Sequence, residues 1–495
     1  MHYVIVGGGS SGWMTAAALA QALKGSQRVT LIESDEIGTV GVGEATIPPL
    51  QFFNKVLGID EREFVRATQA SFKLGIQFHN WGTSGHTYFH QFGEFGANID
   101  GVSFHQVWLR LAANGHPHPL TDYSPAAIAA AQQRFLPPFP GMSPEIPQLA
   151  YAYHFDAGLY ARFLRQYAEQ RGVVRVEGRV VEVGRHAESG SIEALRLQDG
   201  RTVQGDFYLD CSGFQALLIE KTLQTGFIDW SHWLPCNRAL AVPCERNPDH
   251  FHPFTRSTAH RAGWQWRIPL QHRTGNGHVY CSQYVSDDEA AQVLLGHLDA
   301  KALAEPRLLR FTTGRRRKLW NGNCVAIGLA GGFMEPLEST SLHLVQSAVF
   351  RFLSLLPVST VRDPTAEAEF NRLSIEEYEQ IRDFIILHYT SNDRDEPFWR
   401  ACRDVQMPDT LAHRIELFRS RGKVARHNGQ LFADASWVAV MLGQGVMPRH
   451  WDPLADAMPL SELQAKAQSL HTKLHQAIAR MPHHAEFIDR SCKAA

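Results

Sequence analysis

Apolar side chains cluster in two short runs near the amino terminus. Residues 2–6 (HYVIV) and residues 28–34 (RVTLIES) are rich in β-branched side chains, which predicts two strands. Residues 13–23 (WMTAAALAQAL) are rich in small side chains and predict a helix between the strands. The order strand, helix, strand predicts a βαβ unit with parallel strands.

The pattern changes further along the chain. Strand signals continue through residues 263–269 (GWQWRIP), whereas helical spacing takes over after Pro357 and lasts to the end. We therefore expect an α/β fold with two regions. Residues 1–360 would form one domain that begins with the βαβ unit and contains interleaved β segments, and residues 361–495 would form a helical region.

Residues 71–81 (SFKLGIQFHNW) raise a question about one lysine. Apolar residues alternate from Phe72 to Phe78, which predicts a half-buried strand with Lys73 on its opposite face. A lysine in such a position usually meets water, and the pattern alone favours that interpretation. The alternative is that Lys73 points into an interior space.

A glycine turn connects the first strand with the first helix. Gly7-x-Gly9-x-x-Gly12 follows the strand, and Glu33 ends the second strand. Gly7 permits a tight turn, Gly9 lets the backbone approach a pyrophosphate, and Gly12 lets helix and strand pack closely. The helix start near Ser10 offers N–H groups to phosphates, and Glu33 can accept hydrogen bonds from a ribose. Together these features predict a dinucleotide site.

The glycine turn does not show whether the cofactor is NAD or FAD, but two other stretches of the sequence favour a flavin. Residues 210–214 (DCSGF) place Asp210 at a strand end before a glycine turn, which is typical of a second flavin contact. A simple strand-to-loop turn is the alternative. Residues 41–48 (GVGEATIP) supply glycines and Thr46 where a flavin ring would lie.

Charge and composition give no indication of a nucleic-acid or membrane partner. The 495 residues carry a formal net charge of -2, so there is no electrostatic reason to expect nucleic acid or a membrane as a partner. No apolar run reaches the length of a membrane span, and the first residues lack the features of a signal peptide. Seven cysteines without CxxC spacing predict reduced thiols, and we expect a cytoplasmic protein.

Three motifs together resemble the flavin-dependent halogenases of the tryptophan-halogenase type. They are GGGSSGWMTAAALA at residues 7–20, GVGEATIP at 41–48 and GWQWRIP at 263–269, which matches the Trp-x-Trp-x-Ile-Pro signature of that family. The resemblance implies a Rossmann-type, flavin-monooxygenase-like FAD-binding domain with a substrate-side sheet. Residues 361–495 would be the helical region that covers the substrate.

The resemblance implies a two-component enzyme with FAD as its cofactor. A separate flavin reductase supplies reduced FAD, and oxygen then converts chloride or bromide to hypohalous acid. The oxidant travels through an interior tunnel to a small electron-rich aromatic, an indole in the first place. The implied FAD contacts, besides the glycine turn and Glu33, are Ser10, Gly43, Ala45, Thr46, Asp210 and Gly328.

The resemblance also assigns the catalytic residues. Lys73 matches the lysine that lines the tunnel, and Glu338 in EPLEST matches the catalytic glutamate. Trp264 and Trp266 would separate the flavin from the substrate, although ordinary core packing explains an alternating pair equally simply.

The start of the helix after residue 340 is the implied halide site, with Thr340 and Ser341 as its residues. Ser339 and Thr340 are also plausible N-caps, so a purely structural role is the alternative. The family usually carries glycine where this sequence has Ser341. The choice between chloride and bromide therefore stays open.

Two other functions compete with halogenation. One is a flavin monooxygenase that hydroxylates an aromatic substrate, and the other is a redox-silent FAD-binding protein that binds partners. The C-terminal helices show no recognisable clamp for a free amino acid, which favours a neutral indole over tryptophan. A monomer and a homodimer are equally compatible with the sequence.

The histidines do not predict a metal site. His86 and His90 lie in an alternating segment that separates their side chains, and the HPH tract at residues 116–118 lies in a proline-rich loop without ligand spacing. We therefore expect no metal.

Overall fold

The computed structural model describes residues 1–36, 43–143, 147–425 and 429–494. Its first sheet has the strand order β20-β21-β12-β1-β2-β8, and all neighbours are parallel except β20 and β21. The strands are β1 (His2–Val6), β2 (Arg28–Glu33), β8 (Val174–Glu177), β12 (Phe207–Asp210), β20 (Trp320–Asn321) and β21 (Cys324–Ala326). The predicted βαβ unit is present, since α1 (Ser10–Leu23) connects β1 to β2.

The glycine turn is held by close backbone packing. Gly7 has a φ of 115°, and a Cβ there would lie 2.2 Å from the carbonyl oxygen of Cys211. A Cβ on Gly12 would lie 1.8 Å from the carbonyl oxygen of Gly7. The helix begins at Ser10, three residues before the predicted start at residue 13, so Gly12 belongs to its first turn.

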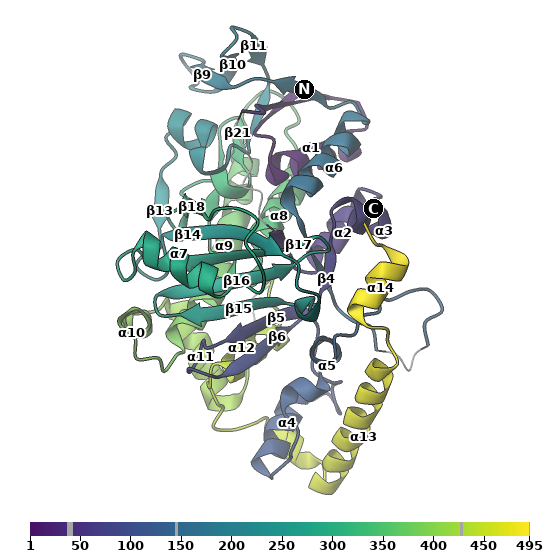
Figure 1. Ribbon diagram of the computed structural model, residues 1–495. Coiled ribbons are helices and arrows are strands. Elements are labelled where there is room, and N and C mark those ends of the chain that lie inside the picture. Colours follow the sequence, from purple (N-terminus) through teal and green to yellow (C-terminus); the bar gives the residue numbers. More distant parts are fainter. Residues whose placement is uncertain (37–42, 144–146, 426–428, 495) are drawn as a thin grey trace.

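A second, seven-stranded sheet lies next to the first and crosses the middle of the view in Figure 1. Its order is β18-β14-β17-β16-β15-β5-β6, and only the β15–β5 pair is parallel. The strands are β5 (Gly75–His79), β6 (Thr87–Gln91), β14 (Arg238–Glu245), β15 (Thr255–His260), β16 (Gly263–Pro269), β17 (Arg273–Tyr280) and β18 (Arg307–Arg310).

Three small sheets and eight α-helices, α1 among them, lie in the described chain before residue 360. The sheets are β3 (Gly43–Ala45), β7 (Ala152–Asp156) and β4 (Ser71–Lys73); β11 (Thr202–Gln204), β10 (Ile192–Leu197) and β9 (Val180–Arg185); and β13 (Phe227–Asp229), β19 (Gly314–Arg316) and β22 (Gly332–Phe333). Besides α1, the helices are α2 (Pro49–Val56), α3 (Glu61–Ala67), α4 (Phe104–Ala113), α5 (Pro125–Ala131), α6 (Ala157–Glu169), α7 (Asp287–Gly296) and α8 (Ser341–Ser354).

The segment around Lys73 differs from the prediction of one half-buried strand. It forms two strands in two sheets, because β4 pairs with β7 whereas β5 pairs with β6 and β15. The break falls at Leu74, whose N–H donates to the carbonyl of Pro253 and whose carbonyl accepts from Phe92. Lys73 is 0% exposed. The alternation was therefore misleading, because both faces of this segment are covered by protein.

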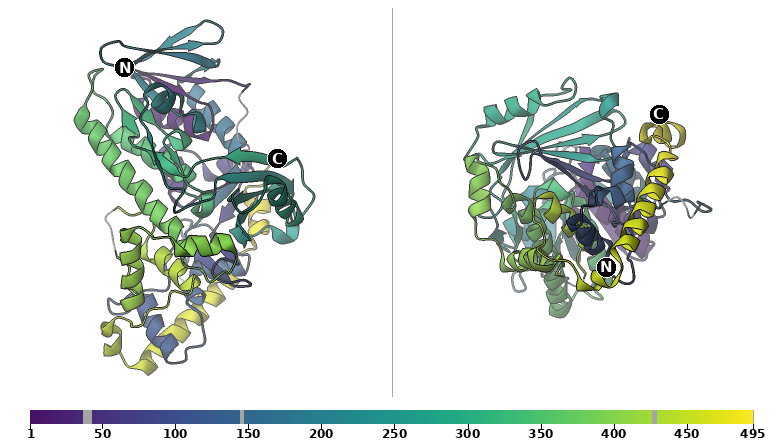
Figure 2. Two further views of the ribbon diagram at one scale, coloured as in Figure 1. Left: turned by 90° about the vertical axis from the view of Figure 1, so that its left-hand side faces the viewer. Right: turned by 90° about the horizontal axis from the view of Figure 1, so that it is seen from below.

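Helices dominate the chain from residue 364 onward. They are α9 (Pro364–Thr390), α10 (Pro397–Asp404), α11 (Asp409–Arg421), α12 (Asp434–Gly443), α13 (Leu460–Ala479) and α14 (His484–Ser491). Figure 2 shows α9 running along the side of the first region. Its Asn371 side chain accepts from the backbone N–H groups of Leu319 and Trp320. The helical region is thus tied to the sheets, and a domain boundary at residue 360 stays a prediction.

Two further observations concern the described residues as a whole. All seven cysteines are buried, and none of them forms a disulfide in the structure. None of the helices in the described ranges combines the length and apolar character that a membrane crossing needs.

Candidate functional site

A cavity of about 910 Å³ opens at the carboxyl end of β1. Such an edge of a parallel sheet is the usual place for a dinucleotide. The residues that line it include Gly7, Gly9, Ser10, Glu33, Gly43, Ala45, Gly328, Trp264, Trp266, Ser339, Thr340 and Ser341. The fold therefore brings most of the predicted cofactor, halide and tryptophan residues around one space.

The glycine turn leaves room for a phosphate group. A Cβ on Gly9 would meet no protein atom within 4 Å, so protein packing alone does not explain this glycine. Glu33 lies at the wall of the same cavity, where Arg175 Nε and Trp13 Nε1 contact its carboxylate at 2.5 and 3.3 Å. An open backbone at the start of α1 and a fixed carboxylate near it fit the pyrophosphate and the ribose of FAD.

Two predicted cofactor residues face away from the cavity. The Thr46 hydroxyl donates to the carbonyl of Tyr153 at 2.8 Å. The buried Asp210 carboxylate accepts from the backbone N–H groups of Leu218 and Ile219, both at 2.8 Å. Asp210 therefore holds the turn that borders the cavity at residues 211–215, and direct FAD contacts by these two side chains stay predictions. Residues 41 and 42 of the second glycine motif lie outside the described residues.

Trp264 and Trp266 form one wall of the cavity. Both are buried on β16, with ring centroids 6.0 Å apart. The indole N–H of Trp264 donates to Glu335 at 2.8 Å, and the Tyr389 hydroxyl donates to the same carboxylate oxygen. Burial raises the pKa of Glu335 to about 7. The sequence interpretation overlooked Glu335, although it stands three residues before Glu338 in the same motif.

Lys73 lies one hydrogen bond from the cavity. Its Nζ donates to the Ser339 hydroxyl at 2.8 Å and to the Thr46 carbonyl at 3.0 Å. The ammonium also lies 5.2 Å from the ring centroid of Phe92. Burial lowers the pKa of Lys73 to about 7, and the charge of Glu338 opposes this only in part. Both the amine and the ammonium form are therefore accessible near neutral pH.

Glu338 is buried between two histidines. His90 Nδ1 contacts one carboxylate oxygen at 2.9 Å, and His388 Nε2 contacts the other at 2.8 Å. Burial alone would raise the pKa of Glu338, but attraction to His90 and hydrogen bonds from both histidines lower it to about 2. Glu338 is therefore an anion at neutral pH although its side chain is buried.

The sequence interpretation gave neither histidine a role. His90 shares the buried face of β6 with Tyr88, which is a signal that its alternating pattern contains. His388 stands alone in the apolar stretch 384–389 (FIILHY) of α9. A lone histidine at a fully buried position needs a polar partner, and here that partner is Glu338.

A chain of side chains extends from Glu338 through His388. Gln444 Nε2 donates to the Tyr88 hydroxyl at 3.2 Å, and this hydroxyl lies 2.8 Å from His388 Nδ1. Burial lowers the pKa of His388, so we assign it as neutral. Tyr88 then donates to Nδ1, so the proton of the neutral ring is on Nε2, which lies 2.8 Å from Glu338 Oε1.

The amino terminus of α8 borders the cavity beside Lys73. Thr340 occupies the N-cap position without a side-chain hydrogen bond, and Ser341 is the first helical residue. Ser339 adopts a left-handed conformation with φ 59°, so it precedes the cap and its hydroxyl is available to Lys73. The first N–H groups of a helix lack partners within the helix, and both Thr340 and Ser341 line the cavity. Their role in halide binding stays a prediction.

Comparison with known proteins agrees with this geometry. A family model described as "Tryptophan halogenase" matches residues 2–460. The chain belongs to the tryptophan halogenase family. It is 35% identical to tryptophan 7-halogenase RebH of Lentzea aerocolonigenes, over 92% of each chain.

Solved structures extend the comparison to the whole fold. Xcc4156, a flavin-dependent halogenase from Xanthomonas campestris, superposes with a TM-score of 0.96 and 49% identity over 100% of this chain and 99% of that chain. BrvH, a flavin-dependent halogenase from Brevundimonas sp. BAL3, gives a TM-score of 0.94 and 44% identity over 99% and 98%. These findings confirm the predicted family, the fold class and a flavin-dependent halogenase, and they favour it over a hydroxylase.

Two glycine variants would test the structural role and the FAD-binding role of the glycine turn independently. Gly12→Ala places a Cβ against the Gly7 carbonyl, so we expect it to lower the free energy of unfolding by roughly 1–3 kcal/mol. Gly9→Ala meets no protein atom and should leave the melting temperature without FAD unchanged while weakening FAD binding. Thermal melts and FAD titration check both expectations. Undiminished FAD affinity in Gly9→Ala would contradict the assigned cofactor site.

The buried charge of Lys73 predicts a pH-dependent stability. Its pKa falls from 10.5, the ordinary value of a solvated lysine, to about 7 in the folded protein. Between these two pH values the unfolded chain binds more protons than the folded protein, so the free energy of unfolding rises with pH. Below pH 7 Lys73 is charged in both states, and the free-energy cost of burying its charge is fully present. The melting temperature of Lys73→Met should therefore exceed that of the native protein. The difference should be largest near pH 6 and smaller near pH 9.

The control for this measurement is Lys301→Met, which removes an exposed lysine. Its difference in melting temperature from the native protein should be the same at both pH values. A pH-independent difference for Lys73→Met as well would mean that Lys73 titrates normally in the folded state.

Proposed function

We propose that this enzyme halogenates small, electron-rich aromatic molecules with reduced FAD from a separate reductase, oxygen, and chloride or bromide. The observation that carries the proposal is the 2.8 Å hydrogen bond from Lys73 to Ser339. Ser339 lines the cavity at the end of β1. A buried lysine with two accessible protonation states therefore lies one hydrogen bond from that cavity. When bound, reduced FAD supplies the electrons for the reaction of oxygen that oxidises the halide.

The proposed role of Lys73 is to carry or polarise the oxidised halogen. As an ammonium it can donate a hydrogen bond to hypohalous acid, and as an amine it can form a haloamine with loss of water. A pKa of about 7 makes both forms available near neutral pH. Its fixed contacts to Ser339 and to the Thr46 carbonyl orient the nitrogen for either role.

The proposed role of Glu338 is electrostatic and basic. Electrophilic attack gives the aromatic ring a positive charge, which a nearby carboxylate stabilises. The ring then loses a proton to restore aromaticity. A carboxylate with a pKa of about 2 is basic enough to accept it, because a protonated aromatic ring is a far stronger acid. His90 and His388 hold both oxygens in place.

The start of α8 is the proposed halide site. Its N–H groups and the positive end of the helix dipole favour an anion at the cavity wall. Ser341 adds a side chain at this point, which narrows the space for the ion. Trp264 and Trp266 are the proposed barrier that keeps the aromatic substrate away from the flavin.

The side chains around Glu338 support an uncharged aromatic substrate. His90 lies 5.6 Å from Phe384 and 6.3 Å from Phe432 between ring centroids, and Phe384 and Phe432 stack at 3.8 Å. Such rings suit a flat apolar molecule. A zwitterionic amino acid needs a partner for each of its charges, or it loses hydration worth several kcal/mol.

Replacing Lys73 with alanine tests the central role of this residue. We expect Lys73→Ala to abolish halogenated product while hypohalous acid, trapped by a soluble scavenger, still forms. The measurement is mass spectrometry of indole products with a reductase, FAD and either halide, and Lys301→Ala serves as the exposed-lysine control. Unchanged product in Lys73→Ala would refute the role of Lys73, and a hydroxylated product formed without halide would favour a monooxygenase.

The substrate preference is tested by comparing indole with free tryptophan. Neutral indole needs only apolar walls, so we expect it to have the higher kcat/KM and to react at C3, its most electron-rich position. Side-by-side kinetics and product analysis measure both expectations. A clear advantage for tryptophan would indicate a clamp in the C-terminal helices, with the buried Arg414 of α11 as its first candidate for the carboxylate.

A further inference from the structure

Glu44 lines the cavity that is assigned to FAD but has no part in the reaction proposed above. It is the middle residue of β3, between the predicted cofactor residues Gly43 and Ala45. Its side chain is half-buried and belongs to the cavity wall. An acidic group in a space for an anionic cofactor needs an explanation, because like charges repel each other.

The small sheet of β3, β7 and β4 places Glu44 near the start of α1. Glu44 pairs with Phe155 of β7, and directly paired residues of antiparallel strands share one face of a sheet. β7 leads into α6, which packs against α1. The carbonyl of Ala157, the first residue of α6, accepts from Ser10 Oγ at 3.5 Å, and both residues line the cavity. Glu44 therefore lies on the side of the cavity where the phosphates of FAD are expected.

The Glu44 carboxylate has no hydrogen-bond or ion-pair partner among the described residues. A Cβ on Gly43 would lie 3.5 Å from Gly275 Cα, so Gly43 faces β17 and strand alternation turns Glu44 away from that strand. Asp156 pairs with Gly43 and therefore lies on this opposite face, where Arg273 Nη2 contacts it at 2.7 Å.

The surrounding charges leave Glu44 uncompensated. The other titratable groups come from the elements around β3 and from the cavity wall, and none of them alters the ionisation of Glu44. They are Tyr153 and His154 of β7, Lys73 of β4, Arg267 of β16, His278 and Tyr280 of β17, Tyr160, Arg162, Arg165 and Glu169 of α6, and Glu33, Glu36, Arg179, Cys211, Lys221 and Tyr378 of the wall.

Repulsion within the cavity favours the protonated form of Glu44. Glu33 already places a carboxylate in the wall, and FAD adds its anionic pyrophosphate. Burial alone raises the pKa of Glu44 to about 7. A nearby anion without a compensating cation raises the pKa of a carboxyl group further. Protonation therefore removes an unpaired charge from the place that FAD occupies.

We propose that Glu44 binds FAD as a neutral carboxylic acid, so that FAD binding takes up a proton from solution. This inference rests on FAD as the cofactor of the proposed function. The neutral acid has an O–H group that can donate a hydrogen bond to an acceptor oxygen of FAD, whereas the carboxylate can only accept. The proton returns to solution when FAD leaves for the reductase, so cofactor exchange becomes dependent on pH.

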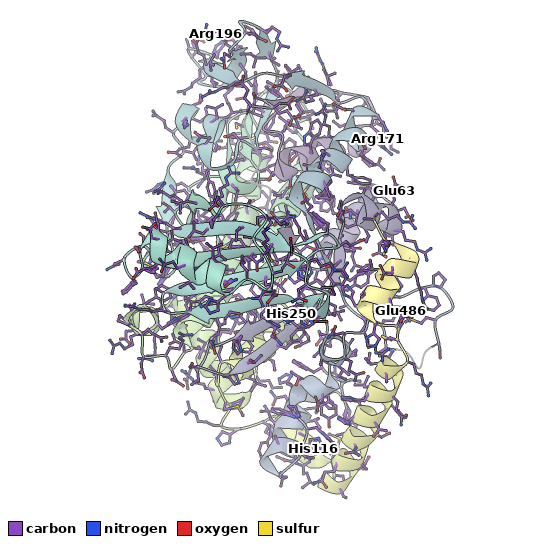
Figure 3. The ribbon with its side chains drawn as sticks, viewed as in Figure 1. Glu63, His116, Arg171, Arg196, His250 and Glu486 are labelled. Carbon is purple, nitrogen blue, oxygen red and sulfur yellow. The ribbon has the colours of Figure 1, made fainter. Side chains whose placement is uncertain are left out.

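The experiment measures FAD affinity between pH 6 and pH 8.5. Oxidised FAD is used, because its own groups do not titrate in this range. With a pKa of about 7 for Glu44 in the free protein, we expect roughly 30-fold weaker binding at pH 8.5 than at pH 6. Glu44→Gln keeps the shape and a hydrogen-bond donor but cannot ionise, so its FAD affinity should be nearly independent of pH. The control is Glu63→Gln, which removes an exposed carboxylate that Figure 3 labels and should behave like the native protein.

Two further variants identify the group that takes up the proton. Lys73 and Glu335 also have pKa values near 7, lowered in the lysine and raised in the glutamate by burial. Lys73→Met and Glu335→Gln should both keep the pH dependence of FAD binding. A pH dependence that persists in Glu44→Gln and disappears in either of these variants would assign the proton to that residue and overturn the proposal.

Calorimetry of the native protein gives the proton number without any variant. FAD is titrated at pH 8 in two buffers with different ionisation enthalpies, and we expect uptake of about one proton per FAD. The melting temperature without FAD checks that Glu44→Gln is folded. Binding of FAD without proton uptake, or a native pH dependence in folded Glu44→Gln, would overturn this inference alone. A native protein that binds no FAD at any pH would instead refute the cofactor of the proposed function.

Discussion

Two opposite charges buried without bulk water are the constraint around which this molecule is arranged. Isolated buried ions are costly, so each must be surrounded by fixed polar partners. Lys73 on β4 has Ser339 and the carbonyl of Thr46, and Glu338 has His90 on β6 and His388 on α9. These partners come from distant parts of the sequence. The small sheet that contains β4, the seven-stranded sheet that contains β6, the turn before α8 and the end of α9 must therefore all meet at one place.

The sequence predicted those features that follow from local rules. The bounds of β1 and β2, the glycine turn and the helix after it obey short-range patterns, since sterically required glycines and apolar periodicity act over a few residues. The cavity residues from Gly7 to Glu33 were predicted for the same reason. Lys73 and Glu338 were singled out through a family resemblance, because the local pattern alone placed Lys73 in water.

The remaining parts of the site depend on contacts that a local pattern does not contain. The split of residues 71–79 into two sheets comes from hydrogen bonds of Leu74 to Pro253 and Phe92, so alternation predicted the wrong burial. The pairing of His90 with Glu338 spans separate elements, as does the bond of Trp264 to Glu335. Thr46 and Asp210 were predicted as FAD contacts, but their side chains bind backbone groups of the protein, so contact with FAD stays a prediction.

Two adjacent residues at the end of α9 contact two different buried carboxylates. His388 contacts Glu338, whereas Tyr389 donates to Glu335, which in turn holds Trp264. One helical segment therefore supports both Glu338, the proposed catalytic carboxylate, and Trp264, which lines the cavity. With the roles proposed above for Glu338 and Trp264, mutations that shift α9 would change both the halogenation of the aromatic substrate and its separation from the flavin. Laboratory evolution toward new substrates should consequently tolerate changes in α11 and α12 more readily than changes at this helix end.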